Sequence, residues 1–152
     1  MNDQGPDIRG IGMTSARTRE RLVQRLADHG ISDLRILDRV RSVPRHLFVD
    51  EALQSRAYED SALPIGHGQT ISQPYIVALM TQALLDGIHP AKPPGKVLEV
   101  GTVCGYQTAI LSPLVRRIFT IARIRELMIE TRARLGDLGY PNIRSSHGYG
   151  MK

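Results

Sequence analysis

The chain has 152 residues, of which 41% are hydrophobic, and a formal net charge of +5. This length and composition fit one folded domain and exclude a disordered chain. There is no run of eighteen apolar residues and no basic-then-apolar leader, so neither a membrane span nor a secretory signal is expected. The single cysteine, Cys104, excludes an internal disulfide and favours a reducing, cytoplasmic location.

Basic residues concentrate in the second part of the chain. Residues 1–90 hold 10 Lys and Arg against 11 Asp and Glu, whereas residues 91–152 hold 10 against 4. A basic region can bind nucleic acid, but aromatic side chains are not interleaved with these charges. Nucleic-acid association is therefore a minor hypothesis, which predicts binding with a steep salt dependence. The five histidines are scattered, so no metal site is expected.

The first part of the chain is predicted to be helical. Residues 1–13 contain three glycines and a proline, which indicates a flexible lead-in. One helix is expected over residues 15–29, with Gly30 as its stop. A second helix is expected after Ser32, which can cap it, and Pro44 ends that helix because proline disfavours helical backbone in the residue before it.

Residues 58–73 combine breaker residues with apolar ones. One proline and two glycines argue against a regular element there, whereas three aliphatic side chains argue against an idle solvent loop. Pro74 is well placed in the first turn of a helix, which we expect to continue to Gly87. The segment HPAKPPG that follows is predicted to be a linker.

Strands and helices are expected to alternate in the last third of the chain. Strands are predicted at 97–100, 118–121 and near 142–146, with helices from 105 and over 124–138. This βαβαβ order implies a parallel sheet.

A glycine-containing loop joins the first of these strands to the helix that follows it. Residues 97–106 read VLEVGTVCGY, which predicts a buried strand, a glycine turn and a helix. That arrangement brings backbone N–H groups and a helix N-terminus to a nucleotide-like ligand. Val103, however, occupies a middle position at which such loops usually have glycine.

Four stretches, GIGMTSARTRERLV, VPRHLFVDEAL, AYEDSALPIGHGQTISQPYIVALM and VLEVGTVCGYQTAIL, together resemble the protein-L-isoaspartate O-methyltransferases. These are protein-repair enzymes that use S-adenosylmethionine, and the resemblance covers roughly residues 10–150. It implies an α/β fold in which a helical, substrate-side region over 14–90 precedes a partial Rossmann-like methyltransferase fold over 91–152. We expect that second region to be truncated after its third strand.

The resemblance implies methylation of isoaspartyl carboxylates in damaged proteins. Ser72 and Asp60 would be the catalytic residues, and five more would bind the substrate: Leu63, Pro64, Ile65, Gly66 and Thr70. The reaction needs no strong base, because a carboxylate is already ionised at neutral pH and positioning supplies most of the acceleration. Two alternatives stay open: Ser72 as the N-cap of the helix after Pro74, and Asp60 as an ordinary loop carboxylate.

By the same resemblance, S-adenosylmethionine would be held by Glu99, Gly101, Thr102, Gly105 and Tyr106. Three positions depart from the family pattern: Val103 replaces a glycine, Ala122 replaces the acid expected at the end of the second strand, and Tyr149 replaces an aspartate. A β-branched side chain disfavours positive φ, and its methyl groups occupy ligand space.

We therefore expect impaired activity and a loss of cofactor binding. The alternative function is a non-catalytic, isoaspartyl-peptide-binding relative that no longer binds S-adenosylmethionine. The strand over 97–100 is expected to be an apolar edge, through which a homodimer would form.

Overall fold

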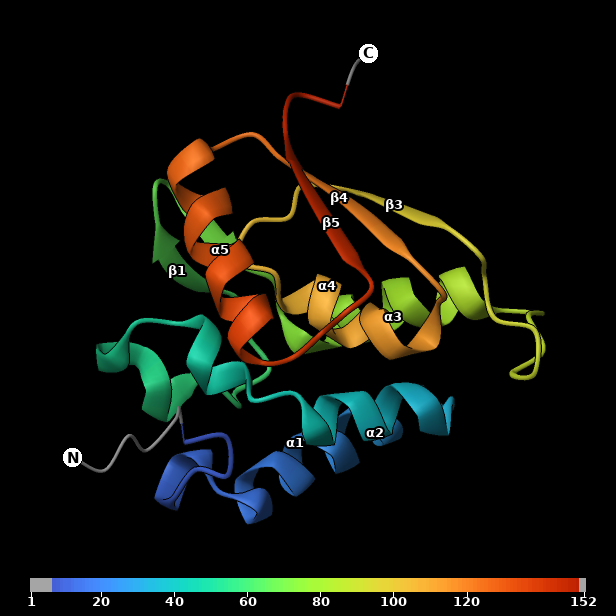
Figure 1. Ribbon diagram of the computed structural model, residues 1–152. Coiled ribbons are helices and arrows are strands. Elements are labelled where there is room, and N and C mark those ends of the chain that lie inside the picture. Colours follow the sequence, from blue (N-terminus) through green and yellow to red (C-terminus); the bar gives the residue numbers. More distant parts are fainter. Residues whose placement is uncertain (1–6, 151–152) are drawn as a thin grey trace.

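A three-stranded parallel sheet lies above a group of α-helices in the computed structural model, which describes residues 7–150 (Figure 1). The strands are β3 (Val97–Val100), β4 (Ile118–Ala122) and β5 (Ile143–His147), in the order β3-β4-β5. Val97 pairs with Ile118, which in turn pairs with Ile143. The α/β class, the parallel pairing and the three predicted strands are confirmed.

Two helices at the bottom of Figure 1 form the layer farthest from the sheet. They are α1 (Ala16–Asp28), whose N-cap Ser15 accepts a hydrogen bond from the backbone of Thr18, and α2 (Leu34–Ser42). The N-cap of α2 is Asp33 and not Ser32 as expected, because a carboxylate oxygen of Asp33 accepts the backbone N–H of Arg35.

A β-hairpin occupies the segment in which no regular element was expected. Its strands are β1 (Leu63–Gly66) and β2 (Gln69–Ile71), which pair antiparallel with a register shift between Pro64 and Gly66. The turn has positive φ at Gly66, His67 and Gly68, of 85°, 54° and 67°. The two glycines therefore build the turn, and the proline is tolerated beside an irregularity in an edge strand.

The remaining helices follow the predicted pattern. These are α3 (Pro74–Leu85), α4 (Tyr106–Leu111) and α5 (Arg125–Asp137). Pro113 follows the short α4 within one of four 3-10 helices, which span Gly12–Thr14, Arg45–Phe48, Glu51–Arg56 and Ser112–Leu114. In Figure 1, α3 and α4 lie between the sheet and the α1–α2 layer, and α5 lies beside β5.

One hydrophobic core joins the two regions that the sequence divides near residue 90. Its buried side chains include Leu26 and Phe48 from the first region and Tyr106, Ile110 and Leu135 from the second. The helical region over 14–90 therefore packs against the region over 91–152, and their division into a substrate side and a cofactor side stays a prediction.

The segment Asp7–Met13 is hydrogen-bonded to the helical region, which differs from the flexible lead-in expected over 1–13. His46 Nε2 lies 2.7 Å from the carbonyl oxygen of Asp7, and Arg19 donates to the carbonyl oxygen of Ile8. Buried polar side chains thus hold the part of this segment that the structure describes. Residues 1–6 lie outside the described residues.

One face of the sheet is open. Glu99 is turned toward α4, where it binds Thr108, whereas Leu98 and Val100 are each 61% exposed. In the register, Leu98 lies beside Phe119 and Val100 beside Ile121. Parallel sheets are normally covered on both faces, but no helix or strand formed by residues 7–150 covers this apolar face or the outer edge of β3.

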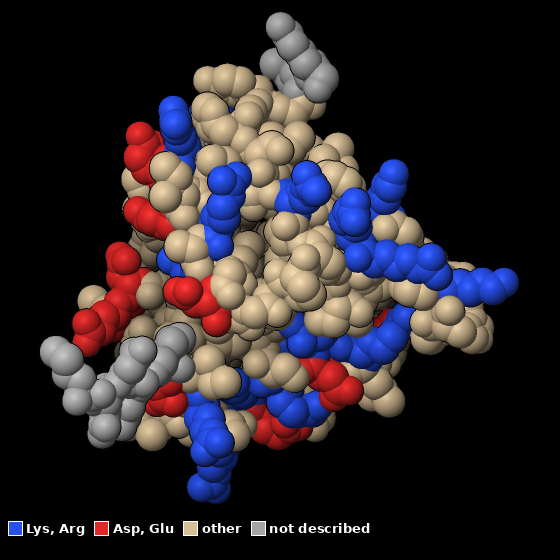
Figure 2. Space-filling model, viewed as in Figure 1, with Lys and Arg blue, Asp and Glu red and all other residues tan. Residues whose placement is uncertain are grey.

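Charged side chains of both signs lie on the face seen in Figure 2. Lys and Arg are most numerous at the upper right but also lie at the upper left and the bottom, whereas Asp and Glu lie along the left side and near the bottom. None of the helices formed by residues 7–150 has the length and apolar character that crossing a membrane requires.

Candidate functional site

Ser72 and the glycine loop line the same hollows, although they lie about thirty residues apart in the chain. A cavity of about 330 Å³ between α3 and β3 is lined by Ser72, Glu99 and Gly101, among others. A second, of about 60 Å³, is lined by Ser72, Gly101, Val103 and Thr70. The structure thus brings together residues that the sequence assigned to the substrate side and to the cofactor side.

The side chain of Ser72 is exposed and forms no hydrogen bond with the described residues, and α3 is not capped by it. Instead, Asp60 caps that helix: its Oδ1 accepts the backbone N–H of Tyr75 at 2.9 Å. The alternative reading of Ser72 as an N-cap is therefore wrong. Its hydroxyl stays available at the wall of both cavities.

Asp60 is a buried carboxylate that holds the start of α3. Its side chain is 8% exposed, Gln73 Nε2 donates to its Oδ2 at 3.2 Å, and Arg25 Nε lies 3.9 Å away. It lines neither cavity at Ser72. The carboxylate therefore fixes the start of α3, two residues beyond Ser72.

The other predicted substrate residues are spread over the hairpin. Leu63 is 1% exposed and belongs to the core, Ile65 is half-buried, and Pro64 and Gly66 face solvent. Only Thr70 shares a cavity with Ser72.

The glycine loop keeps a left-handed conformation at three alternate residues. The φ angles are 97° at Gly101, 52° at Val103 and 86° at Gly105. For an L-residue the left-handed region costs about 1–2 kcal/mol, and a β-branched residue is placed there with difficulty. The loop therefore retains its backbone shape in spite of the valine.

Hydrogen bonds from neighbouring elements enforce that shape. Gly101 N donates to the carbonyl oxygen of Ile121 at 2.8 Å, Thr131 Oγ1 donates to that of Val103 at 3.0 Å, and Arg134 Nη1 donates to that of Cys104 at 3.0 Å. Strand β4 and helix α5 thus hold both sides of the loop.

The two glycines have different roles. A Cβ on Gly101 would meet nothing within 4 Å, so this residue leaves open space for a ligand beside the backbone. A Cβ on Gly105 would lie 2.6 Å from Thr131 Cγ2. Gly105 therefore serves the packing of α5 against the loop.

Glu99 supplies a buried acceptor. Its Oε1 accepts hydrogen bonds from Thr108 (2.5 Å) and Thr120 (2.6 Å), and the Thr120 hydroxyl also lies 2.6 Å from that of Thr102. Oε2 is buried and has no partner among the described residues. Burial raises the pKa of this carboxyl group, and this effect is larger than the lowering of the pKa by the two hydroxyl donors. The free oxygen fits a hydrogen-bond donor entering from the cavity.

Val103 lies between two small cavities and lines both of them. It lines the 60 Å³ cavity at Ser72 and also a cavity of about 100 Å³ that includes Ala122 and Arg123. Ala122 is 3% exposed and leaves no carboxylate at the end of β4. Tyr149 is 70% exposed and lines none of these cavities. The space at the carboxyl end of β4 is thus narrow and lacks the acid that the resemblance implies there.

Three polar residues at the site were not predicted. Gln107 Nε2 donates to Thr81 Oγ1 at 2.9 Å, and both residues line the 330 Å³ cavity with Ser72. Arg45 lies beneath Ser72, whose carbonyl oxygen accepts its Nη2 at 2.8 Å. The available signals were a glutamine in the first turn after the glycine loop and an arginine inside the apolar stretch VPRHLFV.

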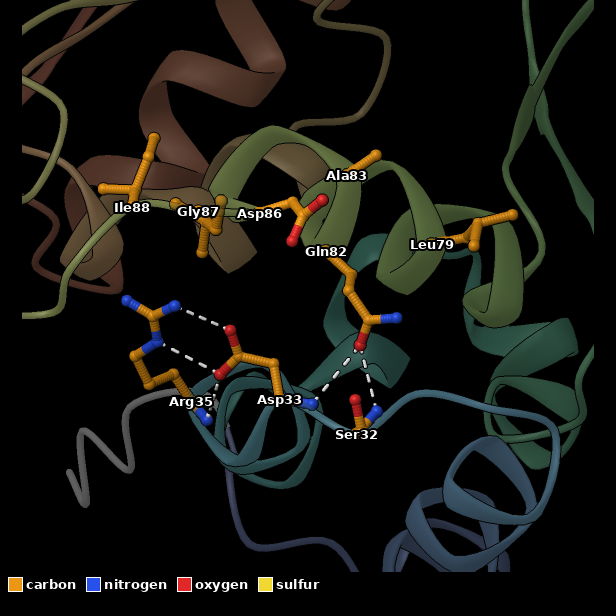
Figure 3. A pocket seen from close by; sticks show the side chains of 10 residues that line it. Ser32, Asp33, Arg35, Leu79, Gln82, Ala83, Asp86, Gly87 and Ile88 are labelled. Carbon is orange, nitrogen blue, oxygen red and sulfur yellow. Dashed lines mark hydrogen bonds and ion pairs between the residues drawn. The ribbon is translucent and has the colours of Figure 1, made fainter.

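Another, larger cavity lies between the start of α2 and the end of α3 (Figure 3). It measures about 490 Å³. Gln82 Oε1 accepts the backbone N–H groups of Ser32 and Asp33, and Asp33 is paired with Arg35. Because Gln82 joins α3 to the start of α2 and Arg35 already neutralises Asp33, the polar groups here have structural partners and this cavity is not the candidate site.

Cys104 is not an accessible thiol. It is 3% exposed, and burial raises the pKa of its thiol. Within residues 7–150, His, Cys, Asp and Glu form no group of three that suits a metal ion.

The family model for protein-L-isoaspartate(D-aspartate) O-methyltransferase matches residues 17–152. The chain belongs to this family. Among curated isoaspartate methyltransferases, that of Cellvibrio japonicus is 58% identical over 143 residues, and that of Alcanivorax borkumensis is 56% identical over the same length. The alignments cover 94% of this chain and 62% and 63% of those relatives, so the chain spans about three-fifths of their length.

Solved methyltransferases of this family share the fold. A protein-L-isoaspartate O-methyltransferase superposes with a TM-score of 0.73 at 27% identity, over 87% of this chain and 42% of the other. A Plasmodium falciparum structure of the same description, in complex with S-adenosyl-L-homocysteine, gives 0.68 at 22% identity over 86% and 62%. The second comparison shows the fold alone.

Proposed function

We propose that the chain acts in S-adenosylmethionine-dependent methylation of isoaspartyl carboxylates in damaged proteins. The observation that carries this proposal is that Ser72 and Gly101 line the same two cavities, so that a carboxylate at the serine lies beside a ligand on the loop. Family membership and the relatives at 54–58% identity support the same reading.

On the substrate side, the proposed role of Ser72 is to orient the carboxylate. Its exposed hydroxyl binds no other group among the described residues, and a hydroxyl donates a hydrogen bond to a carboxylate without titrating at neutral pH. Asp60 contributes by capping α3, which fixes the backbone on which Ser72 stands. Positioning is the main contribution, because the nucleophile is already ionised.

On the cofactor side, the residues fit S-adenosylmethionine in part. Glu99 offers an unpartnered buried oxygen to an ammonium group, and Gly101 offers open space beside its backbone. When bound, S-adenosylmethionine supplies an electrophilic methyl group. The side chain of Val103 narrows the space in which the nucleoside part of the cofactor would lie, and Ala122 offers no carboxylate to it. We propose that these two residues weaken cofactor binding and impair the activity.

The test measures methyl transfer to a synthetic isoaspartyl peptide by mass spectrometry. The matching aspartyl peptide is the substrate control. Wild type should methylate only the isoaspartyl peptide, and Ser72→Ala should lower kcat by at least tenfold. Ser55→Ala, an exposed serine away from these cavities, should match wild type. Methylation of both peptides, or full activity in Ser72→Ala, contradicts the proposal.

The second candidate is an isoaspartyl-peptide-binding protein that does not bind the cofactor. The division of the nucleoside side into cavities of about 60 and 100 Å³ favours it, since ligand sites usually measure 300 Å³ or more. Peptide binding without binding of S-adenosylhomocysteine identifies this candidate.

We also propose self-association through β3. Within residues 7–150 the outer edge of this strand pairs with no other strand, and Leu98 and Val100 are exposed on the open face of the sheet next to that edge. The same edge on a second copy is complementary to it. Leu98→Lys should shift the mass measured by light scattering from dimer to monomer, whereas Leu34→Lys, which changes an exposed leucine on α2, should not. A monomeric wild type excludes the dimer.

A cytoplasmic location is proposed as well. It is supported by the unpaired Cys104, which a reducing compartment keeps as a thiol. Fractionation of cells that express the chain tests this: recovery in a membrane or secreted fraction contradicts it.

A further inference from the structure

Arg45 is a charged side chain that is completely buried, with 0% exposure. Residues 7–150 offer it no ion pair with a carboxylate. Such a group costs free energy, because a buried charge without a counter-ion loses its hydration. Burial also lowers the pKa of its guanidinium, but arginine remains protonated at neutral pH.

Three backbone carbonyl oxygens receive its hydrogen bonds. Arg45 Nε donates to Ala57 at 2.7 Å, and Nη2 donates to Ser61 at 3.3 Å and to Ser72 at 2.8 Å. These carbonyls come from both sides of the hairpin β1–β2. The planar guanidinium therefore joins the start and the end of the segment that leads to Ser72.

The same side chain reaches the glycine loop. Its guanidinium carbon lies 4.7 Å from the centre of the Tyr106 ring, and Tyr106 is the first residue of α4. Arg45 Nη1 and the Tyr106 hydroxyl are both buried and have no hydrogen-bond partner among the described residues. One positive charge thus lies between Ser72 and the end of the loop, without an anion to balance it.

We propose that Arg45 is a positioning residue of the Ser72 site: it fixes the Ser72 backbone, and its uncompensated charge makes the site select a peptide bearing a free carboxylate. This inference rests on the proposed function, because it assigns a cause to the preference for an anionic substrate. A carboxylate bound at Ser72 would bring a negative charge to the residue whose carbonyl oxygen already binds the guanidinium. Because Arg45 is buried and lines neither cavity, its attraction for that carboxylate acts through the protein and is screened less than one between two exposed charges.

The experiment compares the affinity of two probes by calorimetry: an isoaspartyl peptide, and the same peptide with that α-carboxylate converted to a primary amide. Wild type should prefer the acid on the order of tenfold. In Arg45→Gln the preference should fall to about twofold or less, and Arg45→Lys should keep part of it because the charge remains. Arg35→Gln removes a partly exposed arginine that is paired with Asp33 and should change nothing.

Salt dependence provides a measurement that needs no variant. Exposed charges are screened at high ionic strength, whereas a buried one is screened much less. The preference of the wild type should therefore persist in high salt. A preference that vanishes in high salt, or one that folded Arg45→Gln retains in full, overturns the inference.

Hydrogen exchange separates failure of this inference from failure of the proposed function. If wild type binds neither peptide, the proposed function fails, and the positioning role is decided by the amides of Gln73 and Tyr75. These amides should exchange faster in Arg45→Gln than in wild type while those of β4 stay protected. Equal exchange at Gln73 and Tyr75 in the folded variant overturns the role of Arg45.

Discussion

Thr131 Oγ1 donates a 3.0 Å hydrogen bond to the carbonyl oxygen of Val103, and the valine that it holds has a φ of 52°. A β-branched residue does not adopt this backbone by itself. Helix α5 therefore holds the loop in a left-handed conformation at a position occupied by valine. In our proposal, the Val103 side chain then lies in space that the cofactor would use.

Replacing that valine should restore cofactor binding. Val103→Gly removes the side chain between the cavities at Ser72 and at Ala122 and relieves about 1–2 kcal/mol of backbone strain. Its affinity for S-adenosylhomocysteine, measured by calorimetry, should rise at least tenfold over wild type. Val103→Ala keeps a Cβ and should give a smaller gain; an unchanged affinity in Val103→Gly shows that the valine is not the obstacle.

Asp60 should act on stability through the cap of α3. Asp60→Ala loses the acceptor for the Tyr75 amide, which should lower the free energy of unfolding by about 1 kcal/mol and the Tm by about 2–4 °C. Asp60→Asn retains a capping oxygen and should stay near wild type in both stability and methyl transfer. A stable Asp60→Asn protein without methyl transfer would assign the carboxylate a direct catalytic role.

The two loop glycines should differ in tolerance. Gly105→Ala places a Cβ 2.6 Å from Thr131 Cγ2 at a φ of 86°, so it should destabilise the fold by roughly 2–4 kcal/mol. Gly101→Ala also places an alanine at a positive φ, but its Cβ would meet no atom within 4 Å. This variant should therefore lower the free energy of unfolding by only about 1 kcal/mol. Urea unfolding of both variants measures the difference, and equal losses contradict the packing role of Gly105.

Glu99 should make stability depend on pH. Because burial raises its pKa above the ordinary value of 4.5, the folded state holds its proton more tightly than the unfolded state. The stabilisation that Glu99 contributes to the free energy of unfolding is therefore fully present below its ordinary pKa. It is lost as the pH rises through the raised pKa of the folded state. Glu99→Gln mimics the protonated form and should remove this loss, so its Tm should fall less than that of wild type between about pH 4 and pH 8. Parallel curves for the two proteins contradict the assignment.

The sequence predicted the elements whose signals are local. Alternating apolar runs located β3, β4 and β5, and Ser15 and Gly30 marked the two ends of α1. The sequence does not predict the hairpin β1–β2, because proline and glycine are typical of irregular segments, whereas Pro64 here lies at the bulge and the neighbouring glycines form the turn. The conformation of Pro64 and these glycines depends on the pairing of β1 with β2, which is not a local signal.

The roles of the candidate site residues stay predictions, but the structure shows which of these residues lie together. Ser72, Thr70, Gly101, Thr102 and Tyr106 line one cavity, whereas Leu63 belongs to the core and Asp60 caps α3. Such roles depend on which backbone groups lie nearby in three dimensions. The linear sequence carries no signal for the contact between Arg45 and the Ser72 carbonyl, twenty-seven residues apart.

Calorimetric titration of the folded wild-type chain with S-adenosylhomocysteine tests the central claim most directly, because the claim is that the loop at Gly101 still forms a cofactor site beside Ser72. The account predicts saturable binding that is weak and becomes tighter in Val103→Gly. Absence of binding heat in both proteins, with folding verified by circular dichroism, would contradict it and leave a peptide-binding relative of the methyltransferases.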